Sequence, residues 1–301
     1  MTKKYNYKIF GFNVASTFPF LDMPETAGTP LVSISYGAVP QNLAENKVKG
    51  LRYEANADEF LLTVDNVARY YVGHGNTIII APEPDACEAE IMLFLMGSAM
   101  GALLFQRNFL PLHGSAVIVG DGNYGAIFLG HSGVGKSTLA GALQKKGYPL
   151  LADDICAVSV DSDGQALIIP GFPRLKLWAD TLKHFTEDRH KLNRVRKDPE
   201  YEKYFYPALN FASEPIAVGS VFVLNSHNRE EFKITSLSGT EKIDPLLKNT
   251  FRANFLKGIG SKQEHFKQCA AVADQSRVYG ITRPQKGFLL QELISEIEAC
   301  W

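Results

Sequence analysis

The chain has 301 residues, of which 46% are hydrophobic and 21% are charged, and its formal net charge at pH 7 is −1. This length is enough to bury a large core in one or two domains, and the balanced charge gives no basis for binding nucleic acid or an anionic membrane. The cysteines stand far apart without a CxxC pair, which argues against a zinc site or a disulfide framework and favours free thiols in a reducing cytoplasm. They are Cys87, Cys156, Cys269 and Cys300.

The first 87 residues are predicted to form a β-rich domain. Short runs of β-branched and aromatic residues, separated by Gly, Pro, Asn and Asp, predict strands there. These runs are YKIFGFNV, LVSISYGAV, EFLLTVDNV, ARYYVG and TIIIAP. The opening stretch MTKKYNYKIF has no sustained apolar region, so no secretory signal is expected. We therefore expect a cytoplasmic protein with an N-terminal domain over 1–87 and a second domain over 88–301.

A long apolar helix is predicted next, over residues 88–106. Its segment IMLFLMGSAMGALLF carries no charge over 91–105. It is shorter than the ~20 residues that span a bilayer, and Glu88, Glu90 and Arg107 bound it closely. We expect a buried core helix and no membrane association.

The rest of the chain alternates between predicted strands and helices. LPLHGSAVIVG and YGAIFL are expected to form a hairpin with its turn at residues 120–123. The further predicted elements are a helix over 137–147, a strand over 148–160, a turn over 161–164 leading to QALIIPGFPRLKLW, a strand over 217–225, and helices in DPLLKNTFRANFL and GFLLQELISEIEAC. The charged stretch 180–206 is expected to be helical or loop-like. Part of it, 183–205, reads equally well as a mobile lid over an acceptor site and as an exposed helix with intrahelical ion pairs.

The stretch GHSGVGKSTL over 130–139 has the spacing of a phosphate-binding loop, in which four residues separate Gly130 from Gly135-Lys136-Ser137. Glycines let backbone N–H groups point inward onto phosphate oxygens, and the following helix directs its N-terminal dipole at the same anion. Lys136 is expected to reach the β- and γ-phosphates, and the Ser137 hydroxyl to ligate Mg²⁺. A glycine-rich turn capping an ordinary helix is the alternative, but the preceding strand and the following helix favour nucleotide binding. The predicted nucleotide-binding residues are Gly130, Ser132, Gly133, Val134, Gly135, Lys136, Ser137 and Thr138.

Two aspartates follow the loop closely in LLADD, since Asp153 and Asp154 come 17 and 18 residues after Lys136. A helix of about ten residues carries the chain ~15 Å away, and an extended segment of five residues returns it by ~16 Å. The two carboxylates are therefore expected beside the loop, one on Mg²⁺ and one accepting the proton of an attacking hydroxyl. The alternative is a solvated turn or a helix N-cap, which the apolar flanks disfavour.

His113 lies on the strand that precedes the loop strand. A histidine in such a place is more often a core residue than a catalyst, but antiparallel pairing with YGAIFLG would bring one end of its strand near the phosphates. On the residues alone, both interpretations stay open.

Taken together, LHGSAV, IFLGHSGVGKSTL and LLADD resemble, in order and spacing, the C-terminal catalytic domain of HPr kinase/phosphorylase. That family shares its phosphate loop and early aspartate pair with phosphoenolpyruvate carboxykinase. LLFQRNFLPLHGSAV and PGFPRLKLW look still more like HPr-kinase-like proteins of ribosomal peptide pathways, including the lasso-peptide tailoring kinases. The resemblance covers residues 90–225 and implies an α/β fold with a P-loop kinase core of the HPr kinase/phosphoenolpyruvate carboxykinase type, preceded by a β-rich domain.

The resemblance also implies roles for single residues. Asp153 would be the base that deprotonates the acceptor hydroxyl, Asp154 and Ser137 would serve Mg²⁺, and His113 would assist near the transferred phosphoryl group. Arg174, in PGFPRLKLW, would stabilise phosphate charge or position the acceptor. Lys176 follows two residues later, and basic residues after a Pro-Gly turn are commonly just solvated. A homo-oligomer is in keeping with the resemblance.

The sequence thus predicts an ATP-dependent, Mg²⁺-assisted kinase that phosphorylates a hydroxyl, with a serine of a peptide or protein as the expected acceptor, such as the end of a ribosomal precursor peptide. One alternative is an HPr(Ser) kinase/phosphorylase acting on HPr. The family's signature segment after the aspartates has no clear counterpart here, and the N-terminal region differs from the first domain of that enzyme. Another alternative is a regulatory module that binds a nucleotide without catalysis, although binding alone needs neither a base nor an acceptor site.

Overall fold

A computed structural model describes residues 3–20, 23–44, 47–186, 188–229, 231–285 and 289–301, and it shows a mixed α/β chain. The chain divides into two compact units. The first unit comprises residues 1–109, 178–205 and 252–265, and the second comprises 110–177, 206–251 and 266–301. The predicted boundary after residue 87 therefore differs from this division, because residues 88–109 belong with the N-terminal strands and two later segments return to the same unit.

The first unit contains an eight-stranded sheet with the order β1-β2-β3-β8-β7-β6-β5-β4. Its strands are β1 (Tyr5–Ile9), β2 (Phe12–Ser16), β3 (Val32–Tyr36), β4 (Val48–Lys49), β5 (Tyr53–Ala55), β6 (Glu59–Val64), β7 (Ala68–Gly73) and β8 (Thr77–Pro82). Burial alternates along several of them, as in β8, where Ile78 and Ile80 are fully buried between more exposed neighbours. The β-rich character predicted for the N-terminal region is confirmed.

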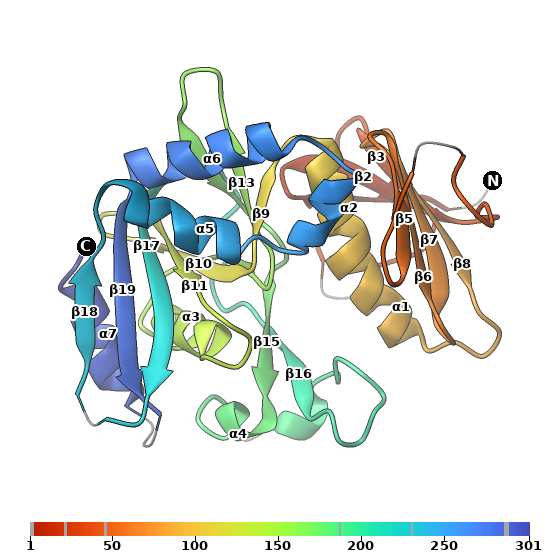
Figure 1. The fold of residues 1–301 in the computed structure, drawn as a ribbon. Coiled ribbons are helices and arrows are strands. Elements are labelled where there is room, and N and C mark those ends of the chain that lie inside the picture. The colour runs from red at the N-terminus through yellow and green to blue at the C-terminus, as the bar shows by residue number, and fades with distance from the viewer. Residues whose placement is uncertain (1–2, 21–22, 45–46, 187, 230, 286–288) are drawn as a thin grey trace. The chain divides into compact units, whose positions relative to one another are not determined.

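The helical segment 88–106 packs within this first unit. It consists of α1 (Glu88–Phe94), the π-helical turn η1 (Leu95–Ala99) and α2 (Met100–Gln106), and Figure 1 shows α1 and α2 beside β5, β6 and β7. The Tyr70 hydroxyl of β7 donates a hydrogen bond to the Ile91 carbonyl at 2.9 Å. Among the described residues this is the one helix whose length and composition would let it cross a membrane, and 67% of its apolar window is buried inside the structure. The prediction of a buried core helix is confirmed.

The second unit contains a nine-stranded sheet. Its main path has the order β12-β10-β11-β17-β14-β13-β9, with β19 added to β17 and β18 added to β19. The strands are β9 (Leu110–Leu112), β10 (Gly114–Val119), β11 (Tyr124–Leu129), β12 (Leu150–Asp153), β13 (Cys156–Val160), β14 (Ala166–Ile169), β17 (Ile216–His227), β18 (Lys233–Ser236) and β19 (Arg277–Pro284). β10 and β11 form the predicted antiparallel hairpin, whereas β11 with β17 and β17 with β19 pair in parallel.

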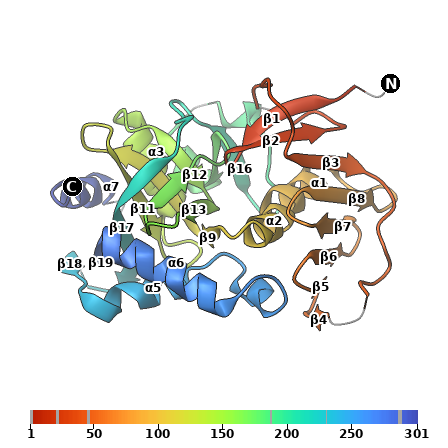
Figure 2. The ribbon, with the colours of Figure 1, turned by 90° about the horizontal axis from the view of Figure 1, so that it is seen from above.

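Helices cover both faces of the sheet in the second unit. They are α3 (Lys136–Lys145), α5 (Ile243–Lys248), α6 (Lys262–Gln275) and α7 (Leu290–Glu298). Figures 1 and 2 agree that α3 lies on one side of β10, β11 and β17, while α5 and α6 lie on the other. Successive side chains of β11 point to opposite faces of the sheet. Ile127 and Leu129 belong to the same buried core as Leu246 of α5 and Val272 of α6. The ring of Phe128, between them in the sequence, instead stacks on Phe222.

Several elements differ from the sequence predictions. The single strand predicted over 148–160 is two strands, β12 and β13, separated by Asp154 with a left-handed φ of 73°. The helix predicted over 244–256 is α5 followed by a separate 3₁₀ turn, η4 (Ala253–Lys257), and the φ of 52° at Arg252 breaks the helical path between them. The helix α6 and the strands β18 and β19 were not anticipated.

The charged stretch after the PGFP turn is built from short elements. They are β15 (Arg174–Trp178), α4 (Ala179–Leu182), the 3₁₀ turn η2 (Arg189–Lys191) and β16 (Lys203–Pro207). Outside this stretch, the 3₁₀ turn η3 (Gly239–Lys242) precedes α5. β15 and β16 form a separate two-stranded sheet. Ion pairs such as Lys183–Asp180 and Lys191–Asp188 do occur in this stretch, at 2.9 and 2.7 Å. Its proposed role as a lid stays a prediction, and residue 187 lies outside the described residues.

Candidate functional site

The loop over 130–135 joins the end of β11 to the start of α3. Gly130, Gly133 and Gly135 have φ values of 141°, 85° and 107°, which L-residues with a Cβ rarely adopt. At Gly130 the need for glycine is also steric, since a Cβ there would lie 2.5 Å from the Leu224 carbonyl oxygen of β17. The loop therefore depends on its glycines for its path, as the sequence motif predicts.

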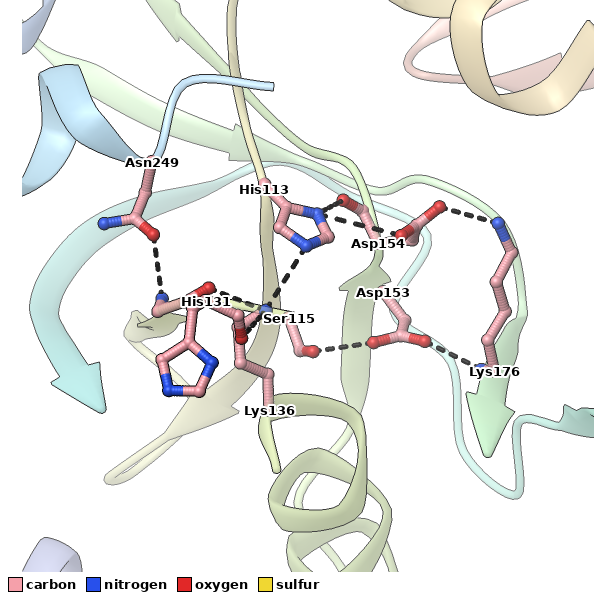
Figure 3. Close-up of polar contacts among 9 residues, drawn as sticks. His113, Ser115, His131, Lys136, Asp153, Asp154, Lys176 and Asn249 are labelled. Atoms are coloured by element: carbon pink, nitrogen blue, oxygen red, sulfur yellow. Dashed lines mark hydrogen bonds and ion pairs between the residues drawn. The ribbon is translucent and has the colours of Figure 1, made fainter. Parts of the chain in front are cut away.

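The side chain of Lys136 turns back onto this loop. Its ammonium donates hydrogen bonds to the Gly130 carbonyl at 2.8 Å and to the His131 carbonyl at 3.1 Å. It also lies 3.3 Å from Nε2 of His113, a contact that is drawn as a dashed line in Figure 3. Lys136 belongs to the first turn of α3 and is only 7% exposed. These contacts hold its ammonium group in place.

His113 and Asp154 meet because two antiparallel strand pairs are interrupted at the same level. β10 pairs with β12 through Ser115 and Asp153, and β9 pairs with β13 through Leu112 and Cys156. Between these two pairs of positions the two chain segments are not paired with each other, and His113 faces Asp154 there. Its Nδ1 lies 3.1 Å from the Asp154 carbonyl oxygen and 3.7 Å from the Asp154 carboxylate.

The tautomer of His113 follows from its neighbours. Because the Lys136 ammonium can only donate, Nε2 of His113 is the acceptor, and the ring proton sits on Nδ1 facing the carbonyl oxygen of Asp154. Burial, and then the positive charge of Lys136, lower the pKa of His113 below its usual value of 6.5. The imidazole is therefore neutral at neutral pH.

Asp153 ends β12 and is held from two sides. The Ser115 hydroxyl donates to its Oδ1 at 2.6 Å, and the backbone N–H of Lys176 donates to its Oδ2 at 2.8 Å. The residue is only 7% exposed. Two donors from neighbouring strands therefore fix the orientation of this carboxylate.

Asp154 lies in a more open position. Its left-handed φ of 73° turns the chain out of β12, and aspartate tolerates this conformation better than most residues. The Lys176 ammonium lies 2.6 Å from its Oδ2, and the two side chains are 14% and 25% exposed. Lys176 thus contacts both aspartates, one through its backbone and one through its side chain.

The other predicted residues lie in the same unit. Ser132, Gly133 and Val134 belong to the loop, and Ser137 and Thr138 to the first turn of α3. Arg174, two residues before Lys176 on β15, has its guanidinium over the ring of Phe172, 5.8 Å from the centroid.

Asn249, which follows α5, belongs to the site and was not found from the sequence. Its Oδ1 accepts a hydrogen bond from the Gly130 N–H at 3.0 Å, and its carbonyl accepts one from the His113 N–H at 2.7 Å. It therefore connects the loop to His113 at the break between β9 and β10. No local pattern marks it, because 119 residues separate it from Gly130.

Two oxygen-bearing side chains could serve a magnesium ion here. The Asp154 carboxylate is partly exposed, and Ser137 places a hydroxyl in the first turn of the helix after the loop. Mg²⁺ prefers oxygen ligands and usually combines one or two carboxylates with substrate phosphates and water. Within the described part of the chain no three His, Cys, Asp or Glu side chains are grouped so that they alone could hold a metal. The donors present fit a cation that shares its ligands with a nucleotide.

No protein-family model matches this chain, and no curated protein matches its sequence. A solved structure to which it is similar is the HPr(Ser) kinase/phosphatase from Coxiella burnetii, with 15% sequence identity and a TM-score of 0.30. The match covers 63% of this chain and 96% of that protein. Similarity at this level assigns no function to the chain.

Proposed function

We propose that this protein is an ATP-dependent phosphotransferase that moves the γ-phosphoryl group of ATP to a hydroxyl group. The observation that carries the proposal is a set of contacts within one unit. The loop lysine Lys136 approaches His113, His113 approaches Asp154, and Lys176 ties Asp154 to Asp153. A loop suited to phosphates and a pair of carboxylates suited to proton transfer thus share one connected network.

The nucleotide end of the site consists of the loop and the start of α3. Backbone N–H groups of a glycine-rich loop and of a helix N-terminus stabilise phosphate oxygens. The Lys136 ammonium sits at this junction, and we assign to it the β- and γ-phosphates of ATP. The ammonium donates hydrogen bonds to two neutral carbonyls, and its positive charge would attract phosphate oxygens at this position.

Mg²⁺ bound by Asp154 and Ser137 would neutralise phosphate charge as the phosphoryl group is transferred. We assign to Asp154 the role of ligand because its carboxylate is more exposed than that of Asp153. Lys176 balances the charge of Asp154 and holds its side chain at the site.

The acceptor end of the site centres on Asp153. Its two hydrogen bonds occupy one lone pair on each oxygen, and a carboxylate offers about four such positions. In the proposed step, the acceptor hydroxyl gives its proton to Asp153 while its oxygen attacks the γ-phosphorus. The bond from that phosphorus to the bridging oxygen of ADP breaks, and ADP leaves with the electron pair.

We propose a serine of a peptide or protein as the acceptor class. Support for this choice comes from the resemblance of LLFQRNFLPLHGSAV and PGFPRLKLW to kinases that modify ribosomal peptides. A precursor peptide ending in serine is therefore the first acceptor to test, and HPr the second.

The test is transfer from ATP labelled in its γ-phosphate to a panel of acceptors: a peptide ending in serine, HPr, and free small alcohols. We expect labelled phosphate in the peptide or in HPr with the wild-type protein, and transfer close to background with the Lys136→Ala variant. Tight ATP binding without transfer to any member of the panel would favour the regulatory module over the kinase.

A further inference from the structure

Arg283 lies at the end of β19, close to the phosphate loop. β19 pairs in parallel with β17, which pairs in parallel with β11, so all three strands end at the edge of the sheet where the loop begins. The Arg283 Nη2 donates a hydrogen bond to the Val134 carbonyl at 3.0 Å. A Cβ added to Gly135 would lie 3.6 Å from the same nitrogen. The guanidinium therefore touches the loop backbone just before Lys136.

The described residues offer no acid that balances the charge of this arginine. In that part of the chain its guanidinium donates to two backbone carbonyls, those of Val134 and Pro284, at 3.0 and 2.9 Å. Among the residues that the structure describes, no carboxylate forms an ion pair with it, in contrast to Lys176, which is paired with Asp154. The side chain is half buried, and this burial lowers the pKa of Arg283 although the guanidinium stays charged at neutral pH.

Burying a cation is costly when the described residues supply no counter-ion, and an anion beside it would offset that cost. A guanidinium has five N–H donors, and phosphate oxygens match its planar fork. The position next to Val134 and Gly135 is where the loop would hold the phosphates of a nucleotide. Charge, geometry and location therefore point to the same ligand.

We propose that Arg283 is a second cationic residue of the nucleotide site, which holds the loop through Val134 and contributes its charge to binding the nucleotide phosphates. This inference rests on the proposed binding of ATP, and it adds a residue from the far end of the chain to the loop and Lys136.

The experiment measures ADP and ATP binding to the full chain by calorimetry at several salt concentrations. The variants are Arg283→Met, which keeps the length of the apolar stem, and Arg283→Lys, which keeps the charge. Arg277→Met is the matched control, because Arg277 begins the same strand and is exposed. We expect Arg283→Met to bind ADP and ATP about tenfold more weakly, as for the loss of a charge-assisted hydrogen bond, with a weaker dependence on salt. Arg283→Lys should lie between that variant and wild type, and Arg277→Met should match wild type.

The outcomes separate the two proposals. If the wild type binds ATP and Arg283→Met binds it equally well, the role of Arg283 is overturned while the proposed function stands. If Arg283→Met binds more weakly but keeps the salt dependence of the wild type, Arg283 only supports the loop and the inference fails. Absence of ATP binding by the wild-type protein would overturn the proposed function and this inference together.

Discussion

The imidazole of His113 accepts a hydrogen bond from the ammonium of Lys136, with 3.3 Å between the two nitrogens. This contact requires a neutral imidazole, because an imidazolium has no lone pair at Nε2 and would repel the lysine. The histidine therefore holds Lys136 in place only while it is unprotonated, and the arrangement of the loop lysine depends on pH.

The first prediction concerns this dependence. The pKa of His113 in the folded state lies below the unfolded value of 6.5. The contribution of His113 to the stability of the folded state is therefore fully present above pH 6.5. The contribution is lost as the pH falls through the lower, folded-state pKa. We expect the free energy of unfolding to fall more steeply with acidification in the wild type than in His113→Gln, measured by urea unfolding between about pH 7.5 and about pH 5.

His265 has a pKa lowered by burial as well, but it is present in both proteins, so the difference between them reports His113. Parallel pH profiles of the two proteins would contradict the assigned protonation state.

The second prediction separates binding from chemistry at Asp153. The side chain of Asn can keep both contacts, accepting from the Lys176 N–H and donating to the Ser115 oxygen, so Asp153→Asn should fold normally. Loss of a general base lowers the rate by about 10²- to 10⁴-fold. We expect a loss of phosphoryl transfer in this range with nearly unchanged ATP affinity. Full transfer activity in Asp153→Asn would rule out its assignment as the base.

The third prediction compares two ion pairs in the same unit. Lys176→Met removes one partner of the partly buried Asp154 carboxylate, and we expect a loss of about 1–3 kcal/mol in the free energy of unfolding. The control is Lys248→Met, which removes an ion pair of similar length, 2.7 Å, whose side chains are 72% and 60% exposed. That variant should lose no more than about 0.5 kcal/mol, because water screens exposed pairs. Equal losses in urea unfolding would show that burial of the Asp154 pair has no energetic effect.

The fourth prediction tests the path of the loop. Gly130→Ala and Gly133→Ala both place an alanine at positive φ, but only the first brings a Cβ within 2.5 Å of a backbone oxygen. Gly133→Ala should cost about 1–2 kcal/mol for the left-handed conformation. Gly130→Ala should cost about 2 kcal/mol more, because the loop must also move away from β17. Denaturant unfolding of the two variants gives the comparison, and equal stability would mean that the loop does not depend on its contact with Leu224.

Local structure can be predicted from the sequence where the residues of a short stretch determine its conformation by themselves. The glycines and the apolar residues before them specify the strand, loop and helix over 124–145, and the turn at 120–123 specifies the hairpin. The buried helix over 88–106 follows from its uncharged segment over 91–105. The same reasoning failed at Asp154 and Arg252, where residues that fit a strand or a helix adopt a left-handed φ of 73° and 52°. Distant pairing lies beside both breaks: β12 with β10 and β13 with β9 on either side of Asp154, and a bridge between Thr250 and Leu112 before Arg252.

The amino-acid sequence alone thus determined the glycine-rich loop and the aspartate pair, because each consists of a few neighbouring residues. Only the tertiary structure decided which other groups join them. His113 and Asp154 are 41 residues apart, Gly130 and Asn249 are 119 apart, and Val134 and Arg283 are 149 apart. The order and direction of the strands in the sheet bring these groups together, and those depend on how the whole core packs rather than on any local pattern.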